Sequence, residues 1–291
     1  MSASPLFTLA VPSSSVRTAA AIVGAPFDLT ASFRRGSREG PSAIRRLSES
    51  LETYSPVLER DLEDLVLVDL GDAVPATAPV GQALDAIERA MGNALSIAQV
   101  AVLLGGEHTV SLAGYRAVRR VYPDAALVQV DAHADLRAEW EGEAITHASW
   151  LNQVGVEFGF ESIFQFGIRS LAREEAAVRR RLGWHSSELL MPTEIADRLC
   201  GQPVYLTIDI DVLDPGTAPG TGSPEPGGAS FRELADFLYA LAPCNVVAFD
   251  IVEVAPNLDP SEVTAAAAAK LVREGVLLFG SEDRDALRLA S

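Results

Sequence analysis

The sequence is poor in cysteine and in basic residues, and it has no long apolar run. Its 291 residues include two cysteines, too few for a disulfide framework, so a reducing cytoplasm is the expected location. Lysine and arginine total 23 against 40 acidic residues, a formal net charge of −17. No nucleic-acid partner is therefore expected, because phosphates need a basic surface. No membrane partner is expected either, since no apolar run approaches the ~18 residues of a span and a signal-peptide pattern is missing.

The chain does have enough apolar sequence for a large core. Hydrophobic residues make up 48% and charged residues 22% of it, a balance typical of a folded protein rather than a disordered one. The acidic excess serves solubility first, and it also attracts a small cationic substrate through long-range electrostatics.

Short apolar runs that predict β-strands alternate along the chain with stretches of helical periodicity. The runs cover residues 20–24, 65–70, 101–104, 126–130, 163–167, 204–208, 246–249 and 276–279, and the helical stretches include 80–99, 230–241 and 263–274. This alternation predicts a parallel sheet, and the nearly continuous apolar runs indicate that helices cover both its faces. We therefore predict a single three-layer α/β/α domain over residues 1–291, with about eight parallel strands and residues 1–19 as an N-terminal extension.

Acidic residues and histidines follow two of these runs at alternate positions. Asp131, His133 and Asp135 come directly after the run 126–130, and alternate residues of a continuing strand point to one face. Asp209 and Asp211 repeat the arrangement at the end of the run 204–208. Two such strand ends predict carboxylate and imidazole groups gathered around metal.

Two further polar residues, His108 and Glu253, stand beyond the runs 101–104 and 246–249. In open α/β sheets ligands bind beyond the carboxyl ends of the strands. Hard carboxylate oxygens together with two imidazoles favour Mn²⁺ over a metal that prefers thiolates. Four aspartates balance the charge of two divalent ions, which predicts a two-metal site holding the bridging hydroxide that such hydrolases use.

On these residues the sequence resembles the ureohydrolase family of arginases, agmatinases and their relatives. The family's three metal motifs resemble residues 105–108 (GGEH), 131–135 (DAHAD) and 209–215 (DIDVLDP), and its loop resembles 218–228 (APGTGSPEPGG). Its opening segment is similar to 23–28 (VGAPFD) and 34–41 (RRGSREGP), so the match runs from about residue 20 to the end. Glu107 stands where many members carry Asp. The resemblance implies an arginase-like fold and a homo-oligomer, trimeric or hexameric.

The resemblance also implies a role for each candidate residue. One Mn²⁺ would be held by His108, Asp131, Asp135 and Asp209, and the other by Asp131, His133, Asp209 and Asp211, with Asp131 and Asp209 bridging. His147 would be the acid–base group, Glu253 would bind the guanidinium, and Asp135 would relay the proton. A carboxylate pairs bidentately with a planar guanidinium, and histidine titrates near neutral pH. The implied reaction is hydroxide attack on the guanidinium carbon, which gives urea and a free amine.

The segment 136–146 (LRAEWEGEAIT) is the main indication of the substrate. Arginase-like members reach the substrate's α-amino and α-carboxylate groups with Asn and Ser side chains here, whereas this segment has neither and carries three glutamates. A carboxylate would be repelled there and a second ammonium favoured, so we predict a small cationic guanidine, either agmatine or N1-aminopropylagmatine. Trp140 is a candidate for cation–π contact with the substrate, and Arg137 is expected to pair with a neighbouring glutamate.

Several alternatives remain open from the sequence. An arginase is one alternative. A guanidino-acid hydrolase or a formiminoglutamate hydrolase is another, and it would need a basic group facing the substrate carboxylate. A histone-deacetylase-like enzyme with one Zn²⁺ would leave His108 and Asp135 without a metal role. A catalytically inactive relative would bind guanidines or partner subunits without turnover. His185 matches no motif and is expected to be structural or exposed.

Overall fold

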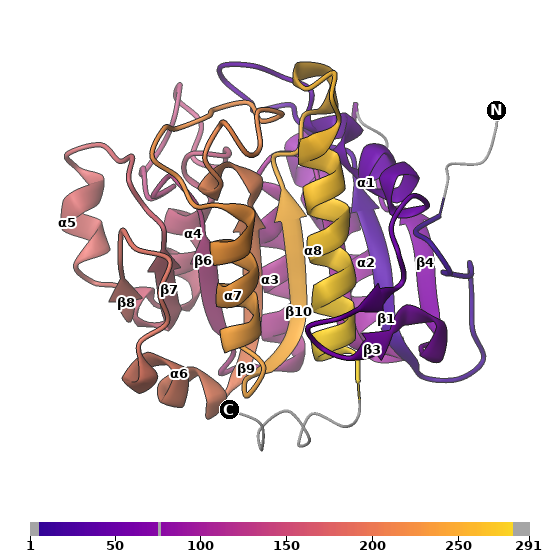
Figure 1. Ribbon diagram of the computed structural model, residues 1–291. Coiled ribbons are helices and arrows are strands. Elements are labelled where there is room, and N and C mark those ends of the chain that lie inside the picture. The colour runs from indigo at the N-terminus through magenta and orange to yellow at the C-terminus, as the bar shows by residue number, and fades with distance from the viewer. Residues whose placement is uncertain (1–5, 75–76, 282–291) are drawn as a thin grey trace.

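The computed structural model describes residues 6–74 and 77–281, and its main feature is an eight-stranded sheet between layers of helices (Figure 1). Neighbouring strands pair parallel throughout, in the order β4-β1-β5-β10-β9-β6-β7-β8. Their bounds are β1 Thr18–Ala25, β4 Leu67–Asp72, β5 Ala98–Gly105, β6 Ala126–Val130, β7 Ile163–Phe166, β8 Trp184–His185, β9 Pro203–Asp209 and β10 Asn245–Val252. A separate antiparallel pair is formed by β2 (Tyr54–Ser55) and β3 (Arg60–Asp61).

Helices cover both faces of the sheet, and each face has its own hydrophobic core. One core joins the strands to α1, α6, α7 and α8, and the other joins them to α2, α3 and α4. The helices are α1 Gly40–Ser48, α2 Val80–Ile97, α3 Val110–Val121, α4 Trp150–Phe158, α5 Glu175–Arg179, α6 Thr193–Cys200, α7 Phe231–Ala240 and α8 Val263–Phe279. Because the central strands are buried on both faces, they need apolar residues at successive positions, which explains their nearly continuous apolar sequence.

The predicted parallel sheet with eight strands is confirmed, but one predicted strand is wrong. Residues 276–279 form the last turn of α8, and all four are buried. An apolar run that is buried on every side cannot be assigned to strand or helix from its periodicity alone. The eighth strand is instead β8, a two-residue edge strand that carries no sequence signal of its own. His185, which was expected to be structural or exposed, is the exposed residue of β8.

The segment before β1, expected as an N-terminal extension, packs on the sheet where the structure describes it. Phe7 is buried, and its backbone N–H donates to the Asp69 carboxylate at 2.9 Å. The same carboxylate accepts two hydrogen bonds from the Arg45 guanidinium, both at 2.8 Å. Across the described ranges, no helix is both long and apolar enough for a membrane crossing.

The sheet order brings the predicted motifs together. Strands β5, β10, β9 and β6 are consecutive neighbours at the centre of the sheet. Since parallel strands end at a common edge, the residues that follow these four strands meet at one place. The long loop 214–228 follows β9 at the same edge and contains little regular secondary structure.

Candidate metal centre

Three of the central strands supply the six predicted metal ligands. His108 follows β5 just before α3, Asp131, His133 and Asp135 follow β6, and Asp209 and Asp211 lie at the end of β9 and in the 3₁₀ turn after it. Gly106 permits the turn after β5 because a Cβ there would come within 1.9 Å of the Phe27 carbonyl oxygen. The opening segment therefore packs directly against the histidine-bearing turn.

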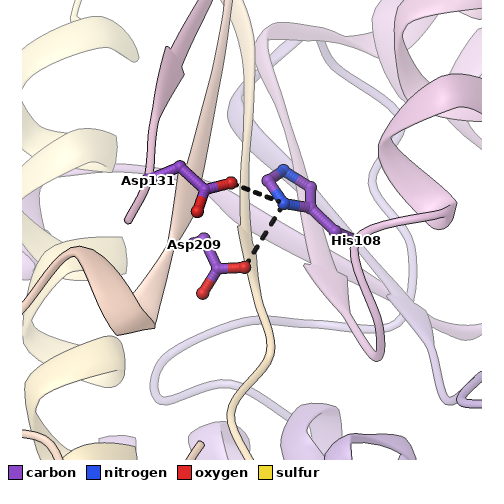
Figure 2. Close-up of side chains that lie close together, drawn as sticks. All are labelled: His108, Asp131 and Asp209. Carbon is purple, nitrogen blue, oxygen red and sulfur yellow. Dashed lines mark ion pairs between the residues drawn. The ribbon is translucent and has the colours of Figure 1, made fainter. Parts of the chain in front are cut away.

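The first group of ligands surrounds His108 (Figure 2). The His108 Nδ1 atom lies 3.0 Å from the Asp131 carboxylate, 3.2 Å from Asp135 and 3.3 Å from Asp209. The imidazole is buried, and its Nδ1 atom makes no hydrogen bond of good geometry. A buried nitrogen that faces three carboxylates without a hydrogen bond fits a shared metal ion better than it fits a protein contact.

The second group of ligands lies around His133. Its Nδ1 atom is 3.0 Å from the Asp211 carboxylate and 3.8 Å from Asp131. Within each group, His108–Asp131–Asp209 and Asp131–His133–Asp211, the ligand atoms all lie within 4.8 Å of one another. Asp131 belongs to both groups and uses a different oxygen toward each histidine. Such an arrangement has the donor set and the spacing for two neighbouring cations.

The buried charges of this cluster also favour the binding of cations. Burial, together with the charges of Asp135 and Asp211, raises the pKa of Asp131 to about 7. Burial and the charge of Asp211 likewise raise the pKa of Asp209 well above its usual value. Burial lowers the pKa of His133, but the carboxylates of Asp211 and Asp131 outweigh that effect and raise it to about 11. Crowded buried carboxylates are stabilised in their charged form by an added positive charge.

A buried hydrogen-bond chain orients His108. Its Nε2 atom lies 2.8 Å from the Thr207 hydroxyl, which donates to the Asp250 carboxylate at 2.6 Å. Because the hydroxyl's proton goes to Asp250, His108 must donate its own proton from Nε2, and Nδ1 is left bare for a metal. The Tyr205 hydroxyl donates to the other Asp250 oxygen at 2.5 Å, which fixes that carboxylate in turn.

The β6 ligands are held in a similar way. The Gln129 amide donates to Asp131 at 2.7 Å, and the Trp150 indole N–H donates to Asp135 at 2.8 Å. Asp135 has a φ of 53° and Glu253 a φ of 63°, in the left-handed region that non-glycine residues rarely adopt. Strained backbone at two candidate site residues is the pattern expected where function constrains geometry.

Glu253 and His147 line a cavity of about 240 Å³ together with ligands of both metal groups. One Glu253 oxygen accepts the His108 backbone N–H at 2.8 Å. Burial and the nearby charge of Glu107 raise the pKa of Glu253 well above its usual value. The His147 Nε2 atom lies 3.0 Å from the Ser32 hydroxyl, and burial lowers the pKa of His147.

Comparison with known proteins agrees with this geometry. Residues 18–278 match the Arginase family. The chain belongs to the arginase family. Over 266 residues it is 42% identical to an agmatinase of Halalkalibacterium halodurans, an alignment that covers 90% of this chain and 92% of that protein. An N(1)-aminopropylagmatine ureohydrolase of Thermococcus kodakarensis is 36% identical over 260 residues, covering 84% of this chain and 86% of the relative.

A solved structure shares the fold as well. The crystal structure of an agmatine ureohydrolase of Thermoplasma volcanium aligns with a TM-score of 0.83 at 31% identity, covering 95% of this chain and 94% of that one. The predicted arginase-like fold is thus confirmed. The enzyme is a ureohydrolase of the arginase family, similar to agmatinases, and it carries two carboxylate–histidine groups for metal.

Within this arginase-family site, Arg137 and Trp140 of the segment 136–146 have other partners than those the sequence suggested. Arg137 lines the cavity, but it pairs with Glu174 at 3.0 Å rather than with a glutamate of its own segment. Trp140 does not line the cavity; its ring stacks with the Arg137 guanidinium, 4.5 Å from the ring centroid. Trp140 is therefore placed to hold Arg137 at the cavity wall rather than to touch a substrate itself.

Several residues of this arginase-family site carry only a faint sequence signal or none. Gln129 and Thr207 are polar residues inside apolar strands, two positions before Asp131 and Asp209, and that placement is a signal for ligand support. Ser32 and Trp150 stand in no comparable pattern. Ser32 comes from a loop 115 positions from His147, a distance in sequence that only the fold can bridge.

Proposed function

We propose that this enzyme is an agmatinase, which hydrolyses agmatine to urea and putrescine with two Mn²⁺ ions bound. The observation that carries the proposal is a single cavity that Glu253 and His147 line together with ligands of two metal-binding groups that share Asp131. The 42% identity to an agmatinase along 90% of the chain supports agmatine as the substrate.

Under this proposal His108, Asp131, His133, Asp135, Asp209 and Asp211 would hold the two ions, and Asp131 and Asp209 would be shared between them. When bound, the ions supply a nucleophile at neutral pH by lowering the pKa of water. Asp131 supports the bridging role because each of its oxygens faces a different histidine. Asp209 lies in the first of the two groups, and its bridging role follows from the family resemblance.

Glu253 would bind and orient the guanidinium. One of its oxygens is engaged by the His108 backbone N–H, which fixes the carboxylate and ties the substrate's position to the turn that carries a metal ligand. Because burial and Glu107 raise the pKa of Glu253, a cation beside it restores the charged form. The site thus gains more from a guanidinium than from a neutral amide.

His147 and Asp135 would handle the proton. His147 lines the cavity together with ligands of both metal groups, so its imidazole would exchange a proton with the departing amine. Its lowered pKa makes it a stronger proton donor once protonated. Asp135 is fixed by the Trp150 indole and lines the same cavity, where it would pass the proton to His147.

The charge of the cavity wall favours a substrate whose far end is an ammonium. The positive charge of Arg137 is offset by Glu174 at 3.0 Å, and the buried carboxylate of Glu175 lines the same wall. A substrate carboxylate would meet no uncompensated cation there. N1-aminopropylagmatine, which would give spermidine and urea, is the second candidate because a relative named for that substrate is 36% identical.

Urea release from agmatine by the Mn²⁺-loaded protein tests the proposal. Glu253→Gln should reduce kcat/KM by roughly 100-fold or more, because it removes the charge that pairs with the guanidinium. Its content of Mn²⁺ should remain two ions per chain. Absence of urea release from agmatine and from aminopropylagmatine by the wild type would contradict the proposal, and loss of metal from the variant would give Glu253 a structural role instead.

Two further features belong to the proposal. A single sheet covered by helices on both faces supports one domain across the chain. A homo-oligomer, trimeric or hexameric, follows from the family resemblance, and sedimentation of the purified protein would test it.

A further inference from the structure

The chain's two cysteines meet in the fold although they are 44 positions apart. Cys200 ends α6 shortly before β9, and Cys244 directly precedes β10. β9 and β10 are paired neighbours, and Pro203 is in register with Asn245 at their amino ends. The Cys200 and Cys244 sulfur atoms lie 2.7 Å apart. Small side-chain rotations would bring them to the ~2.05 Å of a disulfide bond.

This pair lies at the far end of the sheet from the metal centre. β9 runs seven residues from Pro203 to the ligand Asp209, which at about 3.3 Å per residue separates the two ends by roughly 20 Å. Neither cysteine lines the cavity of the metal centre. A bond between the sulfurs would therefore leave the reacting groups in place.

We propose that Cys200 and Cys244 are a site of reversible disulfide formation. The two thiols differ in access: Cys244 is 1% exposed and Cys200 is half-buried at the end of a helix. A small disulfide, such as oxidised glutathione, can therefore reach Cys200 first.

The exchange proceeds in two balanced steps. The Cys200 thiolate attacks one sulfur of the small disulfide, forms a mixed disulfide and releases one small thiolate. The Cys244 sulfur, after losing its proton to solvent, attacks Cys200 and releases the second. In total, two protein thiols are oxidised and one small disulfide is reduced to two thiols.

The bond would stabilise the segment that carries part of the metal centre. The chain between the two cysteines contains β9, the ligands Asp209 and Asp211, and α7. Closing a loop of that length removes conformational freedom from the unfolded chain. The melting temperature should rise by about 5 °C for a chain of this size, while kcat and KM at 25 °C should stay unchanged.

The test uses the full-length, Mn²⁺-loaded protein, incubated in its folded state with either oxidised or reduced glutathione. Protein thiols are then counted in denaturant, the intact mass is measured, and both samples are melted. Cys200→Ser, in which the more exposed thiol is lost, and Cys244→Ser serve as matched controls.

We expect two thiols after reduction and none after oxidation, a monomeric chain lighter by two hydrogen atoms, and a higher melting temperature in the wild type alone. Two thiols that persist after oxidation would overturn the proposal. So would glutathione adducts or disulfide-linked dimers as the sole oxidised products, or an equal thermal shift in Cys200→Ser. None of these readouts depends on the substrate, so they are separate from any failure of the proposed agmatinase activity.

Discussion

Replacing Thr207 with valine should weaken metal binding while leaving the fold intact. Valine has nearly the shape of threonine and lacks only the hydroxyl, so the packing inside β9 is preserved. The substitution removes the hydroxyl that lies 2.8 Å from His108 Nε2 and donates to Asp250 at 2.6 Å. His108 then loses the partner that keeps its proton on Nε2, and Asp250 loses one of its donors.

The size of the effect follows from these contacts. Loss of a hydrogen-bonded partner behind a metal-bound histidine costs about 10- to 100-fold in metal affinity, which is about 1.4 to 2.8 kcal/mol. Of the three hydrogen bonds lost, those with His108 and Asp250 involve a group that is charged or metal-linked, for which about 1.5 to 3 kcal/mol is typical. The third, with the Ser111 hydroxyl at 3.3 Å, joins two neutral groups. We therefore expect the affinity for Mn²⁺ to fall by about 100-fold. The free energy of unfolding should also decrease somewhat.

The assay is a titration of the metal-free protein with Mn²⁺ at fixed pH, in competition with a chelator of known affinity. Thr207→Ser keeps the hydroxyl and is the matched control, which should bind Mn²⁺ within about threefold of the wild type. If Thr207→Val bound Mn²⁺ as tightly as Thr207→Ser while both variants were fully folded, the Thr207 hydroxyl would have no part in metal binding.

Three more predictions concern other groups of the site. Ser32→Ala should lower kcat for agmatine by about tenfold and shift the pH profile of kcat, while KM changes little. The reason is that Ser32 contacts His147 at 3.0 Å and acts through it. An unchanged pH profile would argue against this role. In the metal-free protein, the free energy of unfolding should fall as pH rises from 5 to 7. Burial raises the pKa of Glu107 to about 7, so between its unfolded value and pH 7 the folded state binds the extra proton. This single group contributes about 3 kcal/mol of stability that is present at low pH and lost by pH 7. The free energy of unfolding, measured by denaturant melts at several pH values, should therefore fall less steeply with pH in Glu107→Gln than in the wild type. Finally, His133→Ala should bind one Mn²⁺ per chain instead of two and lose most activity, and a variant with two bound ions and full activity would remove His133 from the metal centre.

The fold could be predicted because hydrophobic periodicity acts locally. Each buried strand between two helical layers needs an apolar run, and those runs marked most of the sheet. The apolar run 276–279 is instead a fully buried helix end, which has the composition of a strand. Strand β8 could not be predicted, because its two residues at the sheet edge are too few to show a period.

The metal ligands could be predicted because they sit on strand ends, where alternate residues share one face. The groups that orient them are harder to predict, since they come from positions distant in sequence. Asp250 contacts Thr207 from the neighbouring strand β10, and Ser32 reaches His147 from an opening loop. Likewise, a count of two cysteines argues against a disulfide framework but says nothing about whether the pair will meet.

The most direct test of the proposed function compares two substrates that share a guanidinium and differ at the other end. Agmatine ends in an ammonium and 4-guanidinobutyrate in a carboxylate, and both release urea in the same assay with Mn²⁺. Because Glu174 offsets Arg137 and Glu175 lines the wall, we expect kcat/KM for agmatine to exceed that for guanidinobutyrate by about 100-fold or more. Equal turnover of the two substrates, or a preference for the carboxylate, would contradict the proposal.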